Sequence, residues 1–540
     1  MRYCLLATLF SATASAALGQ AARDTGSVAR DLATTAAPQP SAQLREVQGL
    51  PEARPVQEGE SARGLTIGAI RVDGVPSLPR EAFAPAYADY LGKQATTQDL
   101  QSLAKAVASV ARARGYVFAT ATIPRQTIEA GMITVQIDEG DIAAVRVVGS
   151  QSARLQRTLD LIVGHGVRRD VLERQLLLAG DIPGIEVLTT KLAHEDIGNV
   201  LIVEVRESRG DGYLGVDNFG ASDLGPERAR LRYDFADLAS DGDVLSVQAV
   251  VTPADPRQLA YLSARYAASI GTAGTQVAVT GALGRAEPAG SGLQSNSTYL
   301  AVSASTPLVR ANAASVWANA EVGVLRVDGT ANGVPDRYDN MAVATGWLYA
   351  TTRTGRGRLS GALSVSRGLG LAGTTVRGDP RASRADASGV FTKGYFWADW
   401  TQPLGHGFSV KLAASGQLAD RPLLAAQEIG LGGASYGRAY DFSERFGDSG
   451  FMGSGEVRWR WSQPVGWIDW IEPYAFADAG RTWNLEGGFG EGDLSSAGGG
   501  ARAALGKLQL SAEVAVPLAS ARASSGDKRP RINVSVGRRF

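Results

Sequence analysis

Short segments in which apolar and polar residues alternate fill the C-terminal part of the chain, from Gly212 onward. Alternation with a period of two is typical of a β-strand, whose successive side chains point to opposite faces. In one such segment, Lys507–Leu518, an apolar face carries Leu508, Leu510, Val514 and Val516 and a polar face carries Lys507, Gln509, Ser511 and Glu513. In another, Val457, Trp459 and Trp461 oppose Glu456, Arg458 and Arg460. Strands of this kind indicate a membrane β-barrel, because lipid contacts the outside and water fills the inside.

The segments number about sixteen, and bacterial barrels have an even number of strands. Connections after even-numbered strands are predicted to be tight, and those after odd-numbered strands longer, as expected for periplasmic turns and outer loops. The tight ones are at Gly355, around His406, at Pro464–Gly466 and at Gly506, and the longest are Ala372–Val390 and Leu418–Asp448. Residues 210–540 are therefore predicted to form a sixteen-stranded transmembrane antiparallel β-barrel, which makes the fold class mainly β.

The pattern between residues 65 and 208 is different and predicts two small α/β units, 65–141 and 142–208. In the first, Thr97–Arg114 has apolar residues at helical spacing, with Thr97 as the expected cap and Gly115 as the expected stop. The second has helical segments around Leu155–Val163 and Val171–Leu178 and ends in the strand Asn199–Val205. Each unit has the size of a small domain.

The first nineteen residues combine a basic residue, Arg2, with an apolar stretch and small residues, which predicts a secretory signal peptide over 1–19. Residues 20–64 are rich in Ala, Arg, Gln and Pro, and they are predicted to form a linker with a possible short helix, which is a candidate plug for the pore. The only cysteine, Cys4, lies within the signal, so we expect no disulfide and no cysteine-bound metal in the exported chain.

The charges balance, with 54 basic and 54 acidic residues, which argues against a nucleic-acid binder because such binding rests on phosphate neutralisation. The three histidines are widely spaced and have no ligand companions, so no metal site is expected. Neither a nucleophile motif nor a phosphate-binding loop is present. We therefore expect neither an enzyme nor a cofactor.

Two stretches carry a resemblance to a known family. ARGYVFATATIPRQTIEAGMITVQIDEGDIAAVRVVG resembles the first polypeptide-transport-associated (POTRA) domain of two-partner secretion transporters, the TpsB family of haemolysin secretion/activation proteins. LLLAGDIPGIEV resembles part of that family's second POTRA domain. The resemblance covers roughly residues 65–540. It implies an outer-membrane barrel with two POTRA domains in the periplasm.

The same family resemblance identifies candidate site residues. Gly437-Arg438-Ala439-Tyr440 resembles the family's Val-Arg-Gly-Tyr motif, carried on a loop that folds into the lumen, although two of the four positions differ. Phe476, Asp478 and Gly480 match a strand motif whose aspartate pairs with that arginine. Arg438 and Asp478 would then form a lumen latch, supported by the motif residues Gly432, Gly433, Gly437, Tyr440, Asp448, Phe476 and Gly480. The alternative, that Arg438 and Asp478 are two ordinary lumen charges, stays open. In a hydrated lumen the pair would contribute about 1 kcal/mol.

The resemblance implies a transporter that binds a large secreted partner protein, such as an adhesin, cytolysin or toxin, in unfolded form and exports it. Contact with outer-membrane lipid and with the barrel assembly machinery is also implied, with Phe540 resembling the terminal aromatic that this machinery recognises. One alternative is a BamA-type assembly factor, a related class that usually carries more POTRA domains. The others are a porin, which would not need the periplasmic units, and a barrel hydrolase, which should show a Ser/His arrangement. The sequence does not identify the partner or the oligomeric state.

Overall fold

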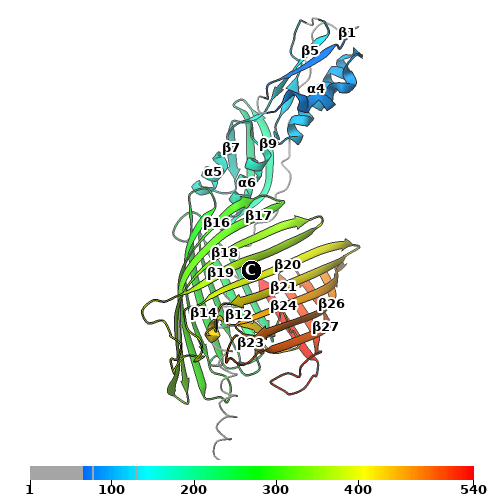
Figure 1. Cartoon of the computed structure of the whole chain (residues 1–540). Coiled ribbons are helices and arrows are strands. Elements are labelled where there is room, and N and C mark those ends of the chain that lie inside the picture. The colour runs from blue at the N-terminus through cyan, green and yellow to red at the C-terminus, as the bar shows by residue number, and fades with distance from the viewer. Residues whose placement is uncertain (1–64, 76–77, 128–129) are drawn as a thin grey trace, which may run out of the picture.

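The computed structural model describes residues 65–75, 78–127 and 130–540. The predicted signal peptide, 1–19, and the predicted linker with its candidate plug, 20–64, lie outside the described residues. Figure 1 shows two small α/β units in a row at one end of a large β-barrel. None of the helices in the described parts of the chain combines the length and the apolar character needed to cross a membrane.

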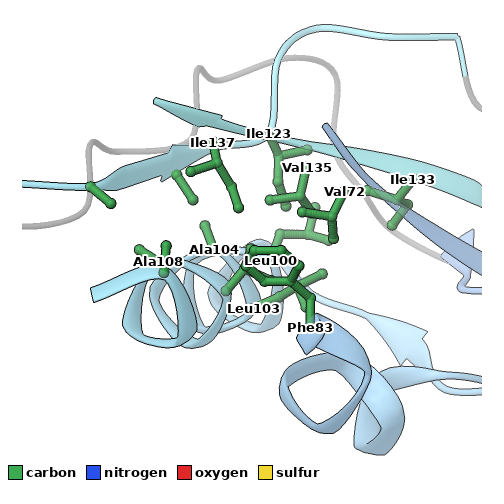
Figure 2. Packing of buried hydrophobic residues seen from close by; sticks show 14 of the residues in the cluster. Val72, Phe83, Leu100, Leu103, Ala104, Ala108, Ile123, Ile133, Val135 and Ile137 are labelled. Carbon is green, nitrogen blue, oxygen red and sulfur yellow. The ribbon is translucent and has the colours of Figure 1, made fainter. Parts of the chain in front are cut away.

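The first α/β unit is a three-stranded sheet covered by a helix. Its strands are β2 (Ala69–Asp73), β4 (Thr120–Thr122) and β5 (Met132–Asp138), in the order β2-β5-β4, with β2 parallel to β5. Helix α4 (Thr97–Ala113) packs Leu100, Leu103, Ala104 and Ala108 against the sheet residues Ile133, Val135 and Ile137 (Figure 2). Short elements complete the unit: β1 (Leu65–Thr66), η2 (Arg80–Phe83), α3 (Ala84–Tyr87), η3 (Ala88–Tyr90) and β3 (Gln94–Ala95).

The cap of α4 differs from the prediction by one position. Thr96, not Thr97, is the N-cap, because its side chain accepts from the Asp99 amide at 3.2 Å. The Asp99 carboxylate in turn accepts from the Thr96 amide at 2.9 Å, which completes a capping box. Two adjacent threonines both satisfy the sequence rule for a cap, and the acidic partner three residues after Thr96 decides between them.

The second α/β unit repeats the connectivity of the first. Its strands are β7 (Ala144–Val148), β9 (Ile185–Glu195) and β10 (Gly198–Glu207), with helices α5 (Ala153–Asp160) and α6 (Arg169–Gly180) between β7 and β9. The sheet order is β7-β10-β9, with β7 parallel to β10 and β9 antiparallel to it. In both units the last strand therefore lies in the middle of the sheet. The short strands β6 (Asp141–Ile142) and β8 (Gly164–His165) pair with each other.

The remaining chain forms a closed antiparallel barrel. Its strands are β11 (Gly210–Asp217), β12 (Arg228–Ala236), β13 (Asp243–Val251), β14 (Leu259–Ile270), β15 (Thr275–Ala286), β16 (Leu293–Arg310), β17 (Ala314–Ala331), β18 (Val334–Thr354), β19 (Gly357–Leu369), β20 (Thr392–Gly405), β21 (Phe408–Ala419), β24 (Ser449–Trp459), β25 (Trp461–Val465), β26 (Ile468–Trp483), β27 (Gly492–Leu505), β28 (Leu508–Pro517) and β29 (Arg531–Arg539). Strands β24 and β25 both pair with β26 and are separated only by Arg460, so together they act as one strand. The predicted barrel of sixteen strands is confirmed, and β11 closes it against β29.

The barrel strands show the predicted division into an outer apolar face and an inner polar face. In β28, Val514 is 45% exposed on the outside, whereas Glu513 is 9% exposed on the inside. An exposed valine next to a shielded carboxylate suits a strand whose surroundings are lipid on one side and the packed lumen on the other.

Connection lengths follow the predicted asymmetry with two exceptions. One is 237–242, which follows the even-numbered strand β12 but is as long as 287–292. The turns 355–356, 406–407, 466–467 and 506–507 are short, and the connections 370–391 and 420–448 are the longest. The prediction of a longer connection after every odd-numbered strand is wrong between β17 and β18, which are joined by 332–333 alone. Here the strands themselves run on for 18 and 21 residues, so the outer projection is a continuous hairpin and not a loop.

Candidate functional site

The long connection 420–448 packs against the inner wall of the barrel. Within it, β22 (Ile429–Leu431) pairs with β23 (Arg445–Gly447). Side chains of this loop share one buried cluster with side chains from β24, β26, β27 and β28: Ile429, Leu431, Ala439 and Tyr440 with Met452, Tyr474, Phe476, Leu494 and Ala515. Tyr440 is fully buried and its hydroxyl donates to the carbonyl of Ser520 at 2.9 Å. The loop is therefore a packed part of the lumen and not a mobile outer segment.

Glycines allow the sharp path of the loop tip. Gly437 has a φ of +71°, and Gly432 and Gly433 have φ of +118° and +105°. A β-branched residue resists this left-handed conformation, so the glycine at 437 fits the turn that this chain adopts. The turn directs the Gly437 amide to Oδ1 of Asp478, to which it donates at 2.8 Å.

Arg438, next to that turn, lies among three carboxylates of the barrel wall. Its guanidinium approaches Glu456 of β24 at 2.7 Å, Glu513 of β28 at 3.1 Å and Asp478 of β26 at 3.4 Å. Its Cζ atom lies 4.2 Å from the centre of the Phe476 ring, a cation–π contact. Arg438 is 6% exposed, so this is a buried charge network and not a hydrated surface pair.

Arg438 and Asp478, the predicted partners, form an ion pair at 3.4 Å but no hydrogen bond with each other through the paired side-chain atoms. The atoms Nε of Arg438 and Oδ2 of Asp478 are the closest pair, and neither makes a hydrogen bond within the described chain. Asp478 instead accepts from the Gly437 amide and from the hydroxyl of Ser496. The hydrogen bond of Arg438 to a carboxylate goes to Glu513.

Glu456 and Glu513 are the partners that the motif comparison missed. Both already stood on the polar face of their strands in the alternating pattern, which was the available signal. Each is also held by a second group. Arg502 donates bidentate hydrogen bonds to Glu456, both of 3.1 Å, and the Tyr474 hydroxyl donates to Glu513 at 2.8 Å. Asn533 links the loop backbone to this network, because its amide donates both to the Arg438 carbonyl and to Glu513.

The other predicted residues occupy separate positions. Gly480 lies under the loop, where a Cβ would come within 2.8 Å of Leu431 and of Met452. Asp448 lies at the base of the loop, fully buried, and accepts from the amides of Leu423 and Leu485. Phe540 lies away from the loop at the barrel seam, which is the place where β11 and β29 pair and close the barrel. Its ring lies 5.9 Å from that of Tyr233.

A second buried arginine, which the sequence did not single out, joins three outer connections. Arg384 in 370–391 bonds to Glu428 at 2.5 Å and to Asp448 at 2.7 Å in 420–448, and to Asn484 at 3.1 Å in 484–491. It also bonds to Asp386 at 2.8 Å. Burial lowers the pKa of Arg384, and the neighbouring acids Asp386, Glu428 and Asp448 more than offset this, so the net shift of its pKa is upward. The guanidinium therefore stays charged and holds the three connections together.

The second α/β unit docks on the short-turn end of the barrel. Asp181, just after α6, binds Arg310 of β16 through two bonds of 2.6 and 2.7 Å. Arg154 of α5 donates to the carbonyls of Ser269 at 2.8 Å and Gly271 at 2.6 Å. The unit is thus fixed to the barrel by directed bonds to at least two neighbouring turns.

Asp181→Asn is expected to loosen this docking by about 2 kcal/mol, because it removes the charge-assisted pair of Arg310, a side chain that is only 5% exposed. The distance distribution between spin labels at His165 and Thr272 should broaden. Asp170→Asn is the matched control, because that aspartate begins α6 but pairs with Arg168 in the same unit and is exposed. Equal distributions for both variants would show that the pair does not set the docking.

Comparisons with known proteins agree with this architecture. Residues 65–140 match the family model "POTRA domain, ShlB-type", and residues 198–503 match "Haemolysin secretion/activation protein ShlB/FhaC/HecB". The heme/hemopexin transporter protein HuxB of Haemophilus influenzae is 26% identical over 167 residues, a match that spans 29% of this chain and 29% of that relative.

Two solved structures share the fold. CdiB from Escherichia coli has a TM-score of 0.70 at 17% identity, over 93% of this chain and 94% of that one. BamA from Haemophilus ducreyi lacking POTRA domains 1–3 has a TM-score of 0.52 at 12% identity, over 88% and 100%. Since the match over 198–503 takes in more than half of the chain, this protein belongs to the ShlB/FhaC/HecB family of haemolysin secretion/activation proteins.

Proposed function

We propose that this protein is an outer-membrane transporter that passes a large secreted partner protein from the periplasm to the cell surface. The family membership supports this function, and so does the likeness of the whole fold to CdiB. In this proposal 65–141 and 142–208 act as two POTRA domains, which receive the partner in unfolded form, and 210–540 form the pore. The partner is an adhesin, cytolysin or toxin, and the protein is not an enzyme.

The observation that carries the proposal is the loop 420–448, which packs inside the barrel around a buried arginine. A purely structural barrel has no need for a large loop whose tip is held by wall carboxylates. A transporter does, because its pore must be closed at rest and opened for the partner. We therefore assign Arg438 and the carboxylates of Glu456, Asp478 and Glu513 as a releasable latch.

Phe540, at the barrel seam, is proposed as the residue that the barrel assembly machinery recognises in the unassembled chain.

Deleting the gene tests the transport function. The expected result is loss of one large protein from the cell surface and medium and its return on complementation, measured by proteomics of surface and secreted fractions. The likeness to BamA supports a second candidate function, assembly of other barrels. In that case the levels of many unrelated outer-membrane proteins fall together, and transport of a single partner is refuted.

A further inference from the structure

The inner face of the β17–β20 wall can be read from its contacts with the loops that enter the barrel. Leu325, Val327 and Met341 pack in one buried cluster with Leu424 of the loop 420–448. The neighbouring Val324 is 47% exposed on the outside. Since side chains alternate between faces, the odd-numbered residues of β17 and β18 face the lumen.

The same reasoning applies to β20. Lys393 donates from its amine to the backbone carbonyl of Gln427 in the loop, at 2.8 Å, so it faces the lumen. Tyr395 and Trp397 lie two and four positions along the strand and share that face.

Five aromatic side chains gather on this inner face, and we call them the aromatic strip: Trp317, Trp347, Tyr349, Tyr395 and Trp397. Trp317 is directly opposite Tyr349 in the sheet, and their ring centres are 5.4 Å apart. The Tyr349 and Trp397 rings are 6.0 Å apart, across the small residue Ala362. The strip therefore runs continuously across β17, β18, β19 and β20.

Such a strip is unexpected inside a barrel, because the lumen is normally polar and aromatic residues form girdles on the outside. Trp317 and Tyr349 are buried at 5% and 6% exposure and form the base of the strip. Trp347 and Trp397 are only partly buried. In the part of the chain that the structure describes, neither indole N–H makes a hydrogen bond, so each keeps a donor available for a ligand.

Residues with hydroxyl groups lie beside the two partly buried tryptophans of the strip, and charged residues flank it. The lumen residues paired beside Trp347 and Trp397 are Ser364 and Ser415. Asp399 and Lys411 form an ion pair on this side of the barrel, Arg310 lies against Trp317, and Lys393 lies two positions before Tyr395.

The strip is continuous with the docked α/β unit at one end. The guanidinium of Arg310 lies 5.4 Å from the Trp317 ring, and the same guanidinium binds Asp181 of the second unit. At its other end Tyr395 packs against the buried cluster of the loop 420–448. The strip thus begins where the periplasmic unit meets the barrel and leads to the loop that closes it.

We propose that the aromatic strip binds the transported chain, as a contact surface for an extended, unfolded polypeptide. Aromatic rings contact apolar side chains and backbone of any sequence, and the indole N–H groups of Trp347 and Trp397 donate to passing backbone carbonyls. This inference rests on the proposed transport function and adds the surface along which the partner moves.

The test uses the full-length protein in planar bilayers, with an unstructured peptide long enough to cross the pore, roughly 20 residues at about 3.3 Å each. The peptide is rich in Gly and Ser with spaced leucines, and it blocks the ion current while it occupies the pore. In the variant with both Trp347→Ala and Trp397→Ala, the block should last about tenfold less time, because two aromatic contacts are lost. Trp400→Ala is the matched control, since Trp400 lies on β20 but faces outward, where it donates to Thr354.

The outcomes separate the strip from the transport function. Peptide blocks of unchanged duration in the double variant overturn the strip and leave transport standing. An increase in ion current without a change in block duration also overturns it, because the strip then holds a segment of this chain and not the substrate. If the wild-type pore is never blocked by the peptide, polypeptide conduction itself is refuted. Partial recovery of the block with Trp347→Phe and Trp397→Phe is expected, since the rings remain but the donors are lost.

Discussion

Arg438→Ala is expected to reduce export of the partner at least tenfold while the barrel still assembles. The substitution leaves the carboxylates of Glu456, Asp478 and Glu513 buried without their shared cation. Removing one partner of a buried charge network costs about 3–5 kcal/mol, far above the value of a hydrated pair. The loop tip should therefore leave the wall. Labelling of a cysteine introduced at the exposed Ser435 should become faster, and heat-modifiable migration of the barrel should stay unchanged.

Arg358→Ala is the control for the alternative that Arg438 is an ordinary lumen charge. Arg358 also faces the lumen, from β19, but it is exposed and has no carboxylate partner in the described structure. A second variant tests the cause: Glu513→Gln added to Arg438→Ala removes one stranded charge and should restore part of the loop packing. If Arg438→Ala and Arg358→Ala export the partner equally well, the latch has to be abandoned.

The network also explains how the proposed latch would release. Arg438 touches three carboxylates, yet the contact to Asp478 lacks a hydrogen bond, and Glu456 keeps Arg502 when Arg438 departs. One of the three wall carboxylates, Glu456, therefore keeps a cation after release, which lowers the free energy needed to open. A single isolated bidentate pair would leave a bare carboxylate in the wall and would open less readily.

The barrel was predictable because its signal is local. The alternation of apolar and polar residues identifies the two faces of each strand within a few residues. A strand without lipid on one face and water on the other would not show this alternation. The hairpin of β17 and β18 escaped prediction because alternation continues past the membrane, so a long strand and a strand with a loop look alike.

The partners of the buried arginines were not predictable in the same way. Glu513 is 75 positions from Arg438, and Asp448 is 64 positions from Arg384. These residues come together only because the barrel closes and the loop turns inward. Neither event produces a recognisable spacing of residues in the sequence. The pairing of Arg438 with Asp478 could be anticipated solely through the family motif. The aromatic strip was partly predictable. The alternation places its members on the inner face of their strands, but it does not show that they lie next to each other.

Arg384→Met is expected to separate the outer connections 370–391, 420–448 and 484–491. Methionine fills much of the space but removes the cation that Glu428 and Asp448 share, and these carboxylates are only 2% and 0% exposed. The cost is about 3–5 kcal/mol, as for other buried pairs that lose one partner. Since Asp448 also holds the amides of Leu423 and Leu485, the base of the loop 420–448 should loosen with it. External protease should then cleave these connections in intact cells much faster than in the wild type.

Arg377→Met provides a closely matched control, because Arg377 lies in the same connection and pairs with Glu486 of 484–491, but both side chains are exposed, at 63% and 44%. An exposed pair contributes about 0–1 kcal/mol, so cleavage should hardly change. High salt should weaken the Arg377 contact and leave the Arg384 contacts intact, since buried pairs are poorly screened. Comparable protease resistance for Arg384→Met and Arg377→Met would mean that backbone packing, and not the buried arginine, joins the outer connections.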